Sequence, residues 1–408
     1  MHLESAWLKF ELYMRYRGGR HGDRMTTSRP KPADIDDGTN DRTIQLVKLL
    51  NEVGPDIPEI SRRLQQFKES VRYRYKEKIL NKGFAVQANV DHERLGLRRV
   101  EAVLDFAEDY KKFSESILAS MNELCYLVGF AKTMPRGYYV AGFSAPREFV
   151  DDLKSFLNLM KEKGMFSRLD IVDFDWIRFS PMKAEFYDFD TGMWDFDWTT
   201  KATSDFGSAQ YMPSGPTKFD YTDLLLIKEY QMDANKSLRE ISDKLKVNYK
   251  KLAWHYSTHV MARRLLNGYS VNWMGTRYDY EIEKVLHRQH RYFAVILMVR
   301  GVTEYETMSL RQALVRLPYL WSEAVGANYS CEFAFPVDFV VEGLQYLTEA
   351  VSAVKDKAEI YTVDQSEAAT FTISYSRFNQ ARKKWEFDLE DLIKRFDKLI
   401  VEIKKETG

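Results

Sequence analysis

The chain has 408 residues, and a size of roughly 100 to 200 residues per domain predicts two to four domains. Its 60 basic and 60 acidic residues balance, which excludes a global attraction to nucleic acid, so any such attraction must be local. The chain contains two cysteines, Cys125 and Cys331, which are too few and too far apart for a disulfide framework. No apolar run approaches the ~20 residues that span a bilayer. We therefore expect a cytoplasmic protein without membrane contact.

The first 39 residues are expected to form a flexible tether. Gly18 to Asn40 is rich in glycine, proline, aspartate and arginine and has no apolar period, which is typical of a flexible segment. Met25 lies within this segment and offers an alternative start, so the sequence leaves open whether residues 1–24 belong to the mature protein.

An internal repeat with a period of about 190 residues organises the rest of the chain. The pattern Ile-Ser-x-x-Leu occurs at 60–64 and again at 241–245, and "VRYRY" at 71–75 corresponds to "LAWHY" at 252–256. Further on, "NELCYL" at 122–127 corresponds to "VRLPYL" at 315–320, and "WDFD" at 194–197 to "WEFD" at 385–388. Because the four matches keep the same order, they predict a duplication.

Each copy opens with three helical stretches and a strand, which predicts a winged helix-turn-helix. Copy one has helical spacing at 42–53, 57–64 and 68–81, and an alternating strand after Gly83 that we interpret as a wing. Copy two repeats this order at 222–232, 238–245 and 249–266, with Gly268 before its strand. We therefore assign one winged helix-turn-helix to residues 40–97 and a second to residues 219–289.

The remainder of each copy alternates strands and helices in the order β-α-β-β-α-β, which indicates a ferredoxin-like domain. We assign these two sensing domains to residues 98–198 and 290–388, joined by a linker at 199–218 and followed by a C-terminal helix at 389–408. The predicted fold class is α+β. We expect the two sensing domains to pair sheet to sheet, as an internal pseudo-dimer within one chain, and the sequence leaves further assembly open.

The third helix of each predicted helix-turn-helix is a candidate recognition helix, because such a helix presents its N-terminal residues to base edges in the major groove of double-stranded DNA. In copy one, Val71, Tyr75 and Ile79 form an apolar stripe that should face inward. Residues 57–82 hold eight basic and three acidic residues, and residues 238–267 hold seven and two. The residues that we expect to face outward and contact DNA are Lys68, Ser70, Arg72, Arg74, Lys76, Asn248, Tyr249, Lys250, Lys251 and His255. The alternative is a three-helix module that contacts only proteins.

The acidic stretch from 170 to 197 holds eight acidic and two basic residues. Its acids alternate with aromatic residues, as strand positions do, so we interpret it as a solvated hairpin that repels DNA. The alternatives are a mimic of nucleic acid and a metal site.

We find no pattern that requires catalysis, a metal or a cofactor, so the sequence favours a protein that is not an enzyme. His255 and His259 have i, i+4 spacing and His287 and His290 have i, i+3 spacing, which can bind a metal, but no third ligand has a suggestive spacing. We therefore interpret these histidines as surface or DNA-facing residues. Both cysteines lie in apolar surroundings, which favours buried structural thiols over nucleophiles.

The stretch from Asp41 to Phe106 resembles the Lrp/AsnC family of transcription regulators. The segments "DRTIQLVKLL", "IPEISRRL", "VRYRY", "NKGF" and "LGL" follow the order of that family, and "RGYYVAGF" resembles a strand of its ligand-sensing domain. The resemblance implies a sequence-specific DNA-binding regulator, here as two tandem copies that read two non-identical half-sites. It also implies a small-molecule effector, whose identity the sequence does not give.

The sequence departs from that family at several positions. Copy one has Phe67 at the cap of the recognition helix, whereas copy two has Asn248, a good cap. Tyr139 and the segment from Ala327 to Ser330 replace the usual sensing loop, which argues against sensing of amino acids.

Two alternatives to a sequence-specific regulator remain. Sirohaem decarboxylases share this architecture, and resemblance to them implies a tetrapyrrole pocket with histidine and arginine on the substrate carboxylates. Copy one has no histidine after His92 in that domain, and the decarboxylases' Cys-Tyr-x-Arg strand is missing. The other alternative is an architectural protein that binds DNA with little sequence preference.

Overall fold

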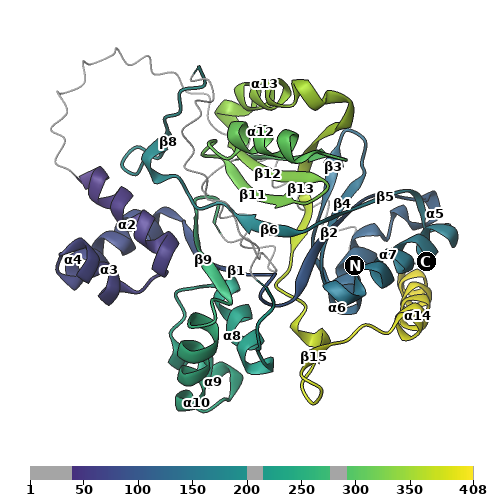
Figure 1. Cartoon of the computed structure of the whole chain (residues 1–408), viewed down its shortest axis with the longest axis horizontal. Helices are drawn as coiled ribbons and strands as arrows, with labels where there is room; N and C mark the ends of the chain where they lie inside the picture. Colours follow the sequence, from purple (N-terminus) through teal and green to yellow (C-terminus); the bar gives the residue numbers. More distant parts are fainter. Residues whose placement is uncertain (1–38, 200–214, 276–291, 408) are drawn as a thin grey trace. The chain divides into compact units, whose positions relative to one another are not determined.

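The computed structural model describes residues 39–199, 215–275 and 292–407 (Figure 1). Within these ranges both helix-turn-helix heads and both β-α-β-β-α-β domains are present, which confirms the predicted α+β fold class and the duplication. The tether predicted at 1–39 lies almost wholly outside the described residues, as do the centre of the linker and the pair His287 and His290.

The two heads have the same local construction. The helices of head one are α2 (Thr39–Val53), α3 (Ile57–Leu64) and α4 (Lys68–Arg74), and α4 continues as a π-helix, η1 (Tyr75–Ile79), and a short 3-10 turn, η2 (Leu80–Lys82). The helices of head two are α8 (Tyr221–Met232), α9 (Leu238–Leu245) and α10 (Tyr249–His255), and α10 continues as the π-helix η5 (Tyr256–Met261).

The sharp turn between the second and third helices has the same cause in both heads. Gln65 and Lys246 adopt a left-handed conformation that ends α3 and α9. The Ser61 hydroxyl donates to the carbonyl of Gln66, and the Ser242 hydroxyl donates to that of Val247 at 2.7 Å. These are the serines of the repeated Ile-Ser pattern, so that pattern marks the turn.

The strand that follows each head does not form a wing within its own copy. Strands β1 (Ala85–Val90) and β9 (Leu266–Asn272) pair with each other, antiparallel, as a two-stranded ribbon between the copies. Buried polar side chains lie on this ribbon, where Asn272 donates to Gln87 at 2.6 Å and Ser270 donates to Asn89 at 3.0 Å. The predicted strands are therefore present, but their partners lie in the other copy.

The two sensing domains share one nine-stranded antiparallel sheet, in the order β5-β2-β4-β3-β13-β10-β12-β11-β6. Copy one contributes β2 (Leu97–Phe106), β3 (Leu127–Met134), β4 (Tyr139–Pro146), β5 (Phe166–Phe174) and β6 (Trp176–Phe179). Copy two contributes β10 (Tyr292–Val299), β11 (Leu320–Val325), β12 (Tyr329–Pro336) and β13 (Ala358–Thr370). The expected pairing of the two sensing domains thus takes the form of one continuous sheet, because β6 pairs with β11 and β13 pairs with β3 across the copies.

The sheet closes on itself as a barrel. Its outermost strands, β5 and β6, are separated along the chain by Asp175 alone, so one segment hydrogen-bonds to β2 with its first half and to β11 with its second. Closure leaves no free edge in this part of the sheet. It also gives the sheet an outer face and an enclosed inner face.

Helices cover the outer face of the barrel. They are α5 (Glu108–Lys111), α6 (Ser114–Cys125), α7 (Val150–Glu162), α12 (Glu304–Leu314) and α13 (Val340–Ala350), with short 3-10 turns η3 (Arg147–Phe149), η6 (Val337–Phe339) and η7 (Ser352–Lys357). The predicted C-terminal helix is present as α14 (Leu389–Thr407), and it packs on α6 and α7 of copy one through Phe396 and Phe156, whose ring centroids are 5.3 Å apart. Cys125 and Cys331 are buried on this side of the sheet, as predicted for structural thiols.

A small hairpin at the end of each copy packs on the other copy. In copy one, η4 (Ala184–Phe186) precedes β7 (Tyr187–Asp188) and β8 (Met193–Trp194); in copy two, η8 (Tyr375–Arg377) precedes β14 (Phe378–Asn379) and β15 (Lys384–Trp385). The Trp194 ring contacts Tyr319 with centroids 5.2 Å apart, and the Trp385 ring contacts Tyr126 at 6.0 Å. These four residues belong to two of the repeated sequence patterns, which therefore mark the contact between the copies.

Candidate functional site

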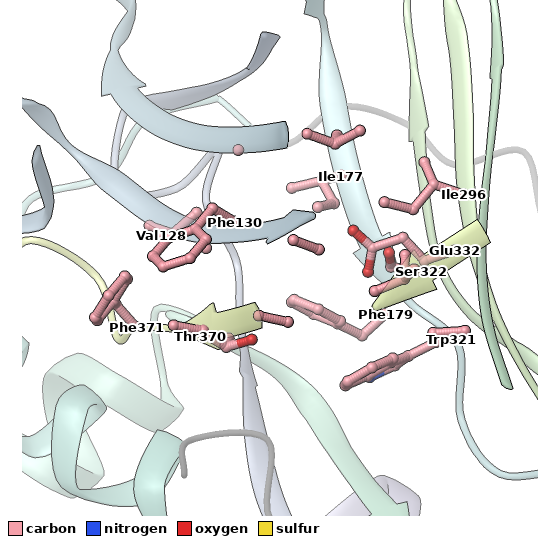
Figure 2. Close-up of a pocket in the computed structure, with 18 of the residues that line it drawn as sticks. Val128, Phe130, Ile177, Phe179, Ile296, Trp321, Ser322, Glu332, Thr370 and Phe371 are labelled. Atoms are coloured by element: carbon pink, nitrogen blue, oxygen red, sulfur yellow. The ribbon is translucent and has the colours of Figure 1, made fainter. Parts of the chain in front are cut away.

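The interior of the barrel is the first candidate site. Because strand residues alternate between the two faces, every second residue points inward. One part of the interior is filled by an apolar cluster that includes Val103, Val140, Phe174, Ile296 and Met298. Next to it lies a cavity of about 180 Å³, lined by both copies. Figure 2 shows Val128 and Phe130 on one side of this cavity and Trp321, Ser322 and Glu332 on the other.

The cavity contains an ion pair between the copies. Arg99 on β2 donates from Nε to Glu101 Oε1 at 3.2 Å, and its Nη2 atom lies 3.8 Å from Oε1 of Glu332 on β12. The Arg99 and Glu101 side chains are only 10% and 4% exposed. Charges this deeply buried are costly unless they are paired, so the three groups must be considered as one unit.

The position of Arg99 depends on a glycine. A Cβ atom added at Gly142 on β4 would lie 2.3 to 2.5 Å from the Arg99 guanidinium, so only glycine leaves room for that group.

The strand register shows which residue of copy two corresponds to Gly142. Pro146 is paired with Leu97, the first residue of β2, and Pro336 is paired in the same way with Tyr292, the first residue of β10. Four residues before each proline stand Gly142 and Glu332, which are therefore equivalent positions in the two copies. The cavity is thus asymmetric in a barrel whose strands are duplicated.

The charged group at the cavity has two carboxylates and one guanidinium. Arg99 and Glu332 line the cavity, whereas Glu101 is paired with Arg99 and is not part of the lining. His92, which lies against the cavity with Nδ1 3.0 Å from the Ser144 hydroxyl, adds no charge because burial lowers its pKa to about 3. Glu101 Oε2 is buried and has no hydrogen-bond partner among the described residues.

The residues expected to replace the family's sensing loop do not line this cavity. Tyr139 lies on β4 on the helix-covered side, where its hydroxyl is 2.8 Å from that of Ser114 and donates to Glu367 at 2.9 Å. Arg99 and Glu332 carried no sequence signal, because each is an isolated charged residue in a strand. Only the inward alternation of β2 and β12 in a closed barrel brings them together.

The recognition helices are the second candidate site. The predicted inward stripe of Val71, Tyr75 and Ile79 is buried, which confirms its orientation. The predicted DNA-contacting residues that are exposed are Lys68, Ser70, Arg72 and Lys76 in head one and Asn248, Tyr249, Lys250 and Lys251 in head two. Asn248 also caps α10, where its side chain accepts from the backbone of Lys250 at 3.0 Å.

Two predicted contact residues are placed differently. His255 is buried, with Nδ1 2.8 Å from Asp223 Oδ1, so the prediction that it faces outward is wrong. Position 255 lies one helical turn after the inward-facing Leu252, and the neighbouring α8 supplies the carboxylate. Arg74 is half-buried and donates to Gln66 Oε1 at 2.8 Å, and burial together with the charge of Arg42 lowers its pKa.

Ion pairs within the heads neutralise part of the basic charge that the sequence places there. Arg62 and Arg63 both pair with Glu59, and Lys244 pairs with the buried Glu229. By contrast, Lys68, Lys76, Lys250 and Lys251 form no ion pair with any carboxylate in the described parts of the chain. These four lysines therefore remain available to a partner.

No protein-family model and no curated sequence matches the chain. Among solved structures, the sirohaem decarboxylase NirDL aligns with 90% of this chain and 99% of its own, at 11% identity and a TM-score of 0.49. The same enzyme in complex with an iron-uroporphyrin III analogue gives a TM-score of 0.48 at 11% identity, over 89% of this chain and 98% of its own. A regulator of the AsnC family from Pyrococcus furiosus aligns with 34% of this chain and 89% of its own, at 16% identity and a TM-score of 0.26.

The prediction that this chain is not an enzyme is corrected, since NirDL, which aligns with 90% of this chain, is itself an enzyme. That prediction relied on the lack of a catalytic pattern in the sequence, but the charged groups of the barrel come together only in the folded chain.

Among the helices that the structure describes, we find none with the length and apolar composition that a membrane span requires.

Proposed function

We propose that the chain binds double-stranded DNA through its two helix-turn-helix heads and that the heads read non-identical half-sites. The observation that supports this proposal is the orientation of the third helices. Apolar residues of this helix are buried in both heads, and the lysines without an ion-pair partner are exposed on the same helix. Exposed cations on a recognition helix suit phosphate and base contacts in the major groove.

The two heads offer different chemistry to DNA. Arg72 in head one can make bidentate hydrogen bonds to guanine, whereas Asn248, Tyr249 and Lys250 begin the recognition helix of head two. A symmetric homodimer reads a palindrome because its two heads are identical. This chain has no such constraint, so its two half-sites should differ in sequence.

Selection of bound sequences from a random DNA library, followed by footprinting, tests this proposal. Lys250→Ala with Lys251→Ala should weaken protection of one half-site and reduce the slope of log affinity against log salt by about 2, since each lost phosphate contact contributes about 0.9. Arg72→Ala should relax base preference in the other half-site, at a cost of about 1 to 3 kcal/mol.

The matched control replaces two exposed lysines away from the heads. Lys394→Ala with Lys398→Ala on α14 removes the same charge and should leave affinity for the selected site unchanged. Equal weakening by the control pair and the head pair would show that only overall charge matters. Failure of the library to yield any protected site would overturn DNA binding.

A second candidate function is the binding and conversion of a small molecule in the barrel, and the Arg99, Glu101 and Glu332 group is the observation that favours it. A cavity of about 180 Å³ is close in size to one of about 150 Å³ that holds benzene. A tetrapyrrole contains four pyrrole rings, so it is larger than this cavity. Absorbance titration with an iron porphyrin carrying carboxylates tests this case: a saturable spectral shift that Arg99→Met abolishes would support it, and an unchanged spectrum would exclude it.

A further inference from the structure

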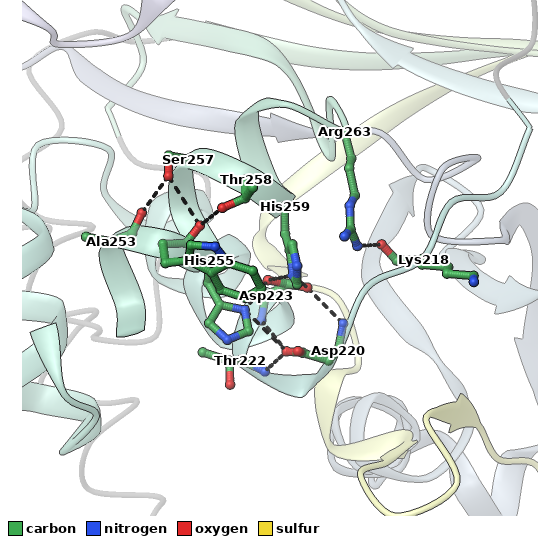
Figure 3. A network of polar contacts seen from close by, with 11 residues as sticks. Lys218, Asp220, Thr222, Asp223, Ala253, His255, Ser257, Thr258, His259 and Arg263 are labelled. Carbon is green, nitrogen blue, oxygen red and sulfur yellow. Dashed lines mark hydrogen bonds and ion pairs between the residues drawn. The ribbon is translucent and has the colours of Figure 1, made fainter. Parts of the chain in front are cut away.

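Head two contains a cluster of metal-ligating side chains that head one lacks. Asp220 and Asp223 lie at the start of α8, and His255 and His259 lie one turn apart on α10 and η5 (Figure 3). One ligand atom from each of the four residues lies within 4.8 Å of the other three. Asp223, His255 and His259 are buried, while the Asp220 side chain is 32% exposed.

The polar atoms of the cluster lie at hydrogen-bond distances, slightly shorter than the separations around a metal ion. His255 Nδ1 lies 2.8 Å from Asp223 and 3.7 Å from Asp220, and His259 Nδ1 lies 2.9 Å from Asp223 Oδ2. A tetrahedral zinc ion with bonds of about 2.0 to 2.2 Å separates its ligand atoms by roughly 3.3 to 3.6 Å. To admit an ion, the contacts of Asp223 with the two imidazoles would lengthen by about half an ångström, while Asp220 already lies near the required separation.

The surroundings of the cluster orient the ligands. The Trp254 ring lies against both imidazoles, with centroids 4.5 Å from His259 and 5.0 Å from His255. The backbone N–H groups of Thr222 and Asp223 donate to Asp220 Oδ1 at 2.8 and 3.3 Å, and that of Asp220 donates to Asp223 Oδ2 at 2.8 Å. Outer contacts of this kind hold metal-binding carboxylates in place.

The duplication provides an internal comparison. The matched positions in head one are Thr39, Arg42, Arg74 and Lys78, none of which is a ligand for a divalent metal at neutral pH. The charge of Arg42 acts on Arg74, so the same place in head one is positive. Because head one forms the same fold without the cluster, the histidines and aspartates of head two are not needed to build the fold itself.

We propose that head two binds one divalent transition-metal ion, of which zinc is the representative, through Asp220, Asp223, His255 and His259. Two imidazoles and two carboxylates form a donor set suited to zinc and its neighbours in the first transition row. The ion links the start of α8 to the recognition helix of head two. It replaces the hydrogen bonds that the two imidazoles form with Asp223 in the absence of metal. Metal binding should therefore stabilise head two alone.

The test uses the full chain after removal of metal by a chelator. Zn²⁺ is titrated in competition with a chromophoric chelator, and Co²⁺ is added separately to look for the visible absorption of a tetrahedral complex. We expect one equivalent of either ion per chain. His255→Gln with His259→Gln should lower the affinity by more than the ~10- to 100-fold that loss of an outer contact costs.

Two further variants keep the result interpretable. His287→Gln with His290→Gln removes the other closely spaced histidine pair and should retain the one equivalent of metal. Asp220→Asn preserves the helix cap while removing a charged ligand, and it should weaken binding by at least ~10-fold even if the double histidine variant does not fold. Absence of stoichiometric binding to folded wild-type chain, or full retention of binding by both site variants, would overturn the proposal.

Discussion

Gly142 determines whether the buried charges of the barrel can meet, because the Arg99 guanidinium occupies the space of its missing side chain. We expect Gly142→Ala to displace Arg99 from Glu101 and Glu332 and to lower the free energy of unfolding by about 1 to 3 kcal/mol, as overpacked cores do. Urea unfolding of the variant measures this loss. Gly215→Ala is the control, since nothing lies within 4 Å of its added Cβ, and its effect should stay within about 0.5 kcal/mol. Equal effects of both variants would contradict the assigned role of Gly142.

Lys183 makes stability depend on pH. Its ammonium donates to the carbonyls of Val315 and Leu317 at the end of α12, and burial lowers its pKa to about 7. In the unfolded chain its pKa returns to about 10.4, so between these values the unfolded state binds more protons. The free energy of unfolding should therefore rise with pH from about 7 to about 10, relative to a Lys183→Met variant. Unfolding curves across this range measure the difference between the two proteins, and a constant difference would refute the prediction.

At the scale of elements, the ribbon of β1 and β9 fixes how the two copies pair. Its register places Gln87 opposite Ser270 and Ala88 opposite Tyr269, and the buried pairs Gln87 with Asn272 and Asn89 with Ser270 satisfy each other. A slip by one residue would move every side chain to the other face and leave these polar groups unpaired. The polar pairs therefore specify the register of the ribbon, while its apolar residues contribute buried surface that stabilises it.

Removal of one member of such a pair should cost more than removal of both. Gln87→Leu leaves the buried amide of Asn272 without its acceptor, and we expect a loss of about 1 to 3 kcal/mol in the free energy of unfolding. Gln87→Leu with Asn272→Leu should recover much of that loss, because no buried donor remains unpaired. Thermal or urea unfolding of the two variants decides the matter. Additive losses would indicate that the amides do not act as a pair.

At the scale of the whole molecule, the two copies are connected by hydrogen-bonded strands as well as by side-chain packing. Pairing of β6 with β11, of β13 with β3 and of β1 with β9 crosses between them, and each terminal hairpin packs on the opposite copy. Neither copy can close its part of the barrel without the other. The functional unit is thus a single cooperative structure with two distinct heads.

This organisation predicts the behaviour of a divided chain. If residues 1–199 and 200–408 are produced together as separate fragments, they should copurify at a ratio of one to one and elute with the intact protein in size exclusion. Each fragment produced alone should aggregate or fail to fold, because its barrel strands would expose unpaired edges. Two fragments that fold and remain monomeric separately would show that the copies are independent domains.

Local patterns in the sequence were sufficient for the elements and their duplication. The repeated Ile-Ser-x-x-Leu pattern marked both helix-turn-helix turns, and the inward stripe of Val71, Tyr75 and Ile79 followed from helical periodicity. These features depend on contacts between residues that are close in sequence, so spacing alone reveals them. The tyrosines and tryptophans of the other repeats were visible as matches, although their contact with each other was not.

Tertiary structure alone decided the partners of the strands and the composition of both sites. Arg99 and Glu332 are more than 200 residues apart and meet only because the barrel closes. In the same way, the sequence showed His255 and His259 as an isolated pair, and the packing of α8 against α10 and η5 supplied Asp220 and Asp223. Periodicity identifies which face of an element is buried, but it carries no information on which distant element covers that face, and buried charges acquire their chemistry from that partner.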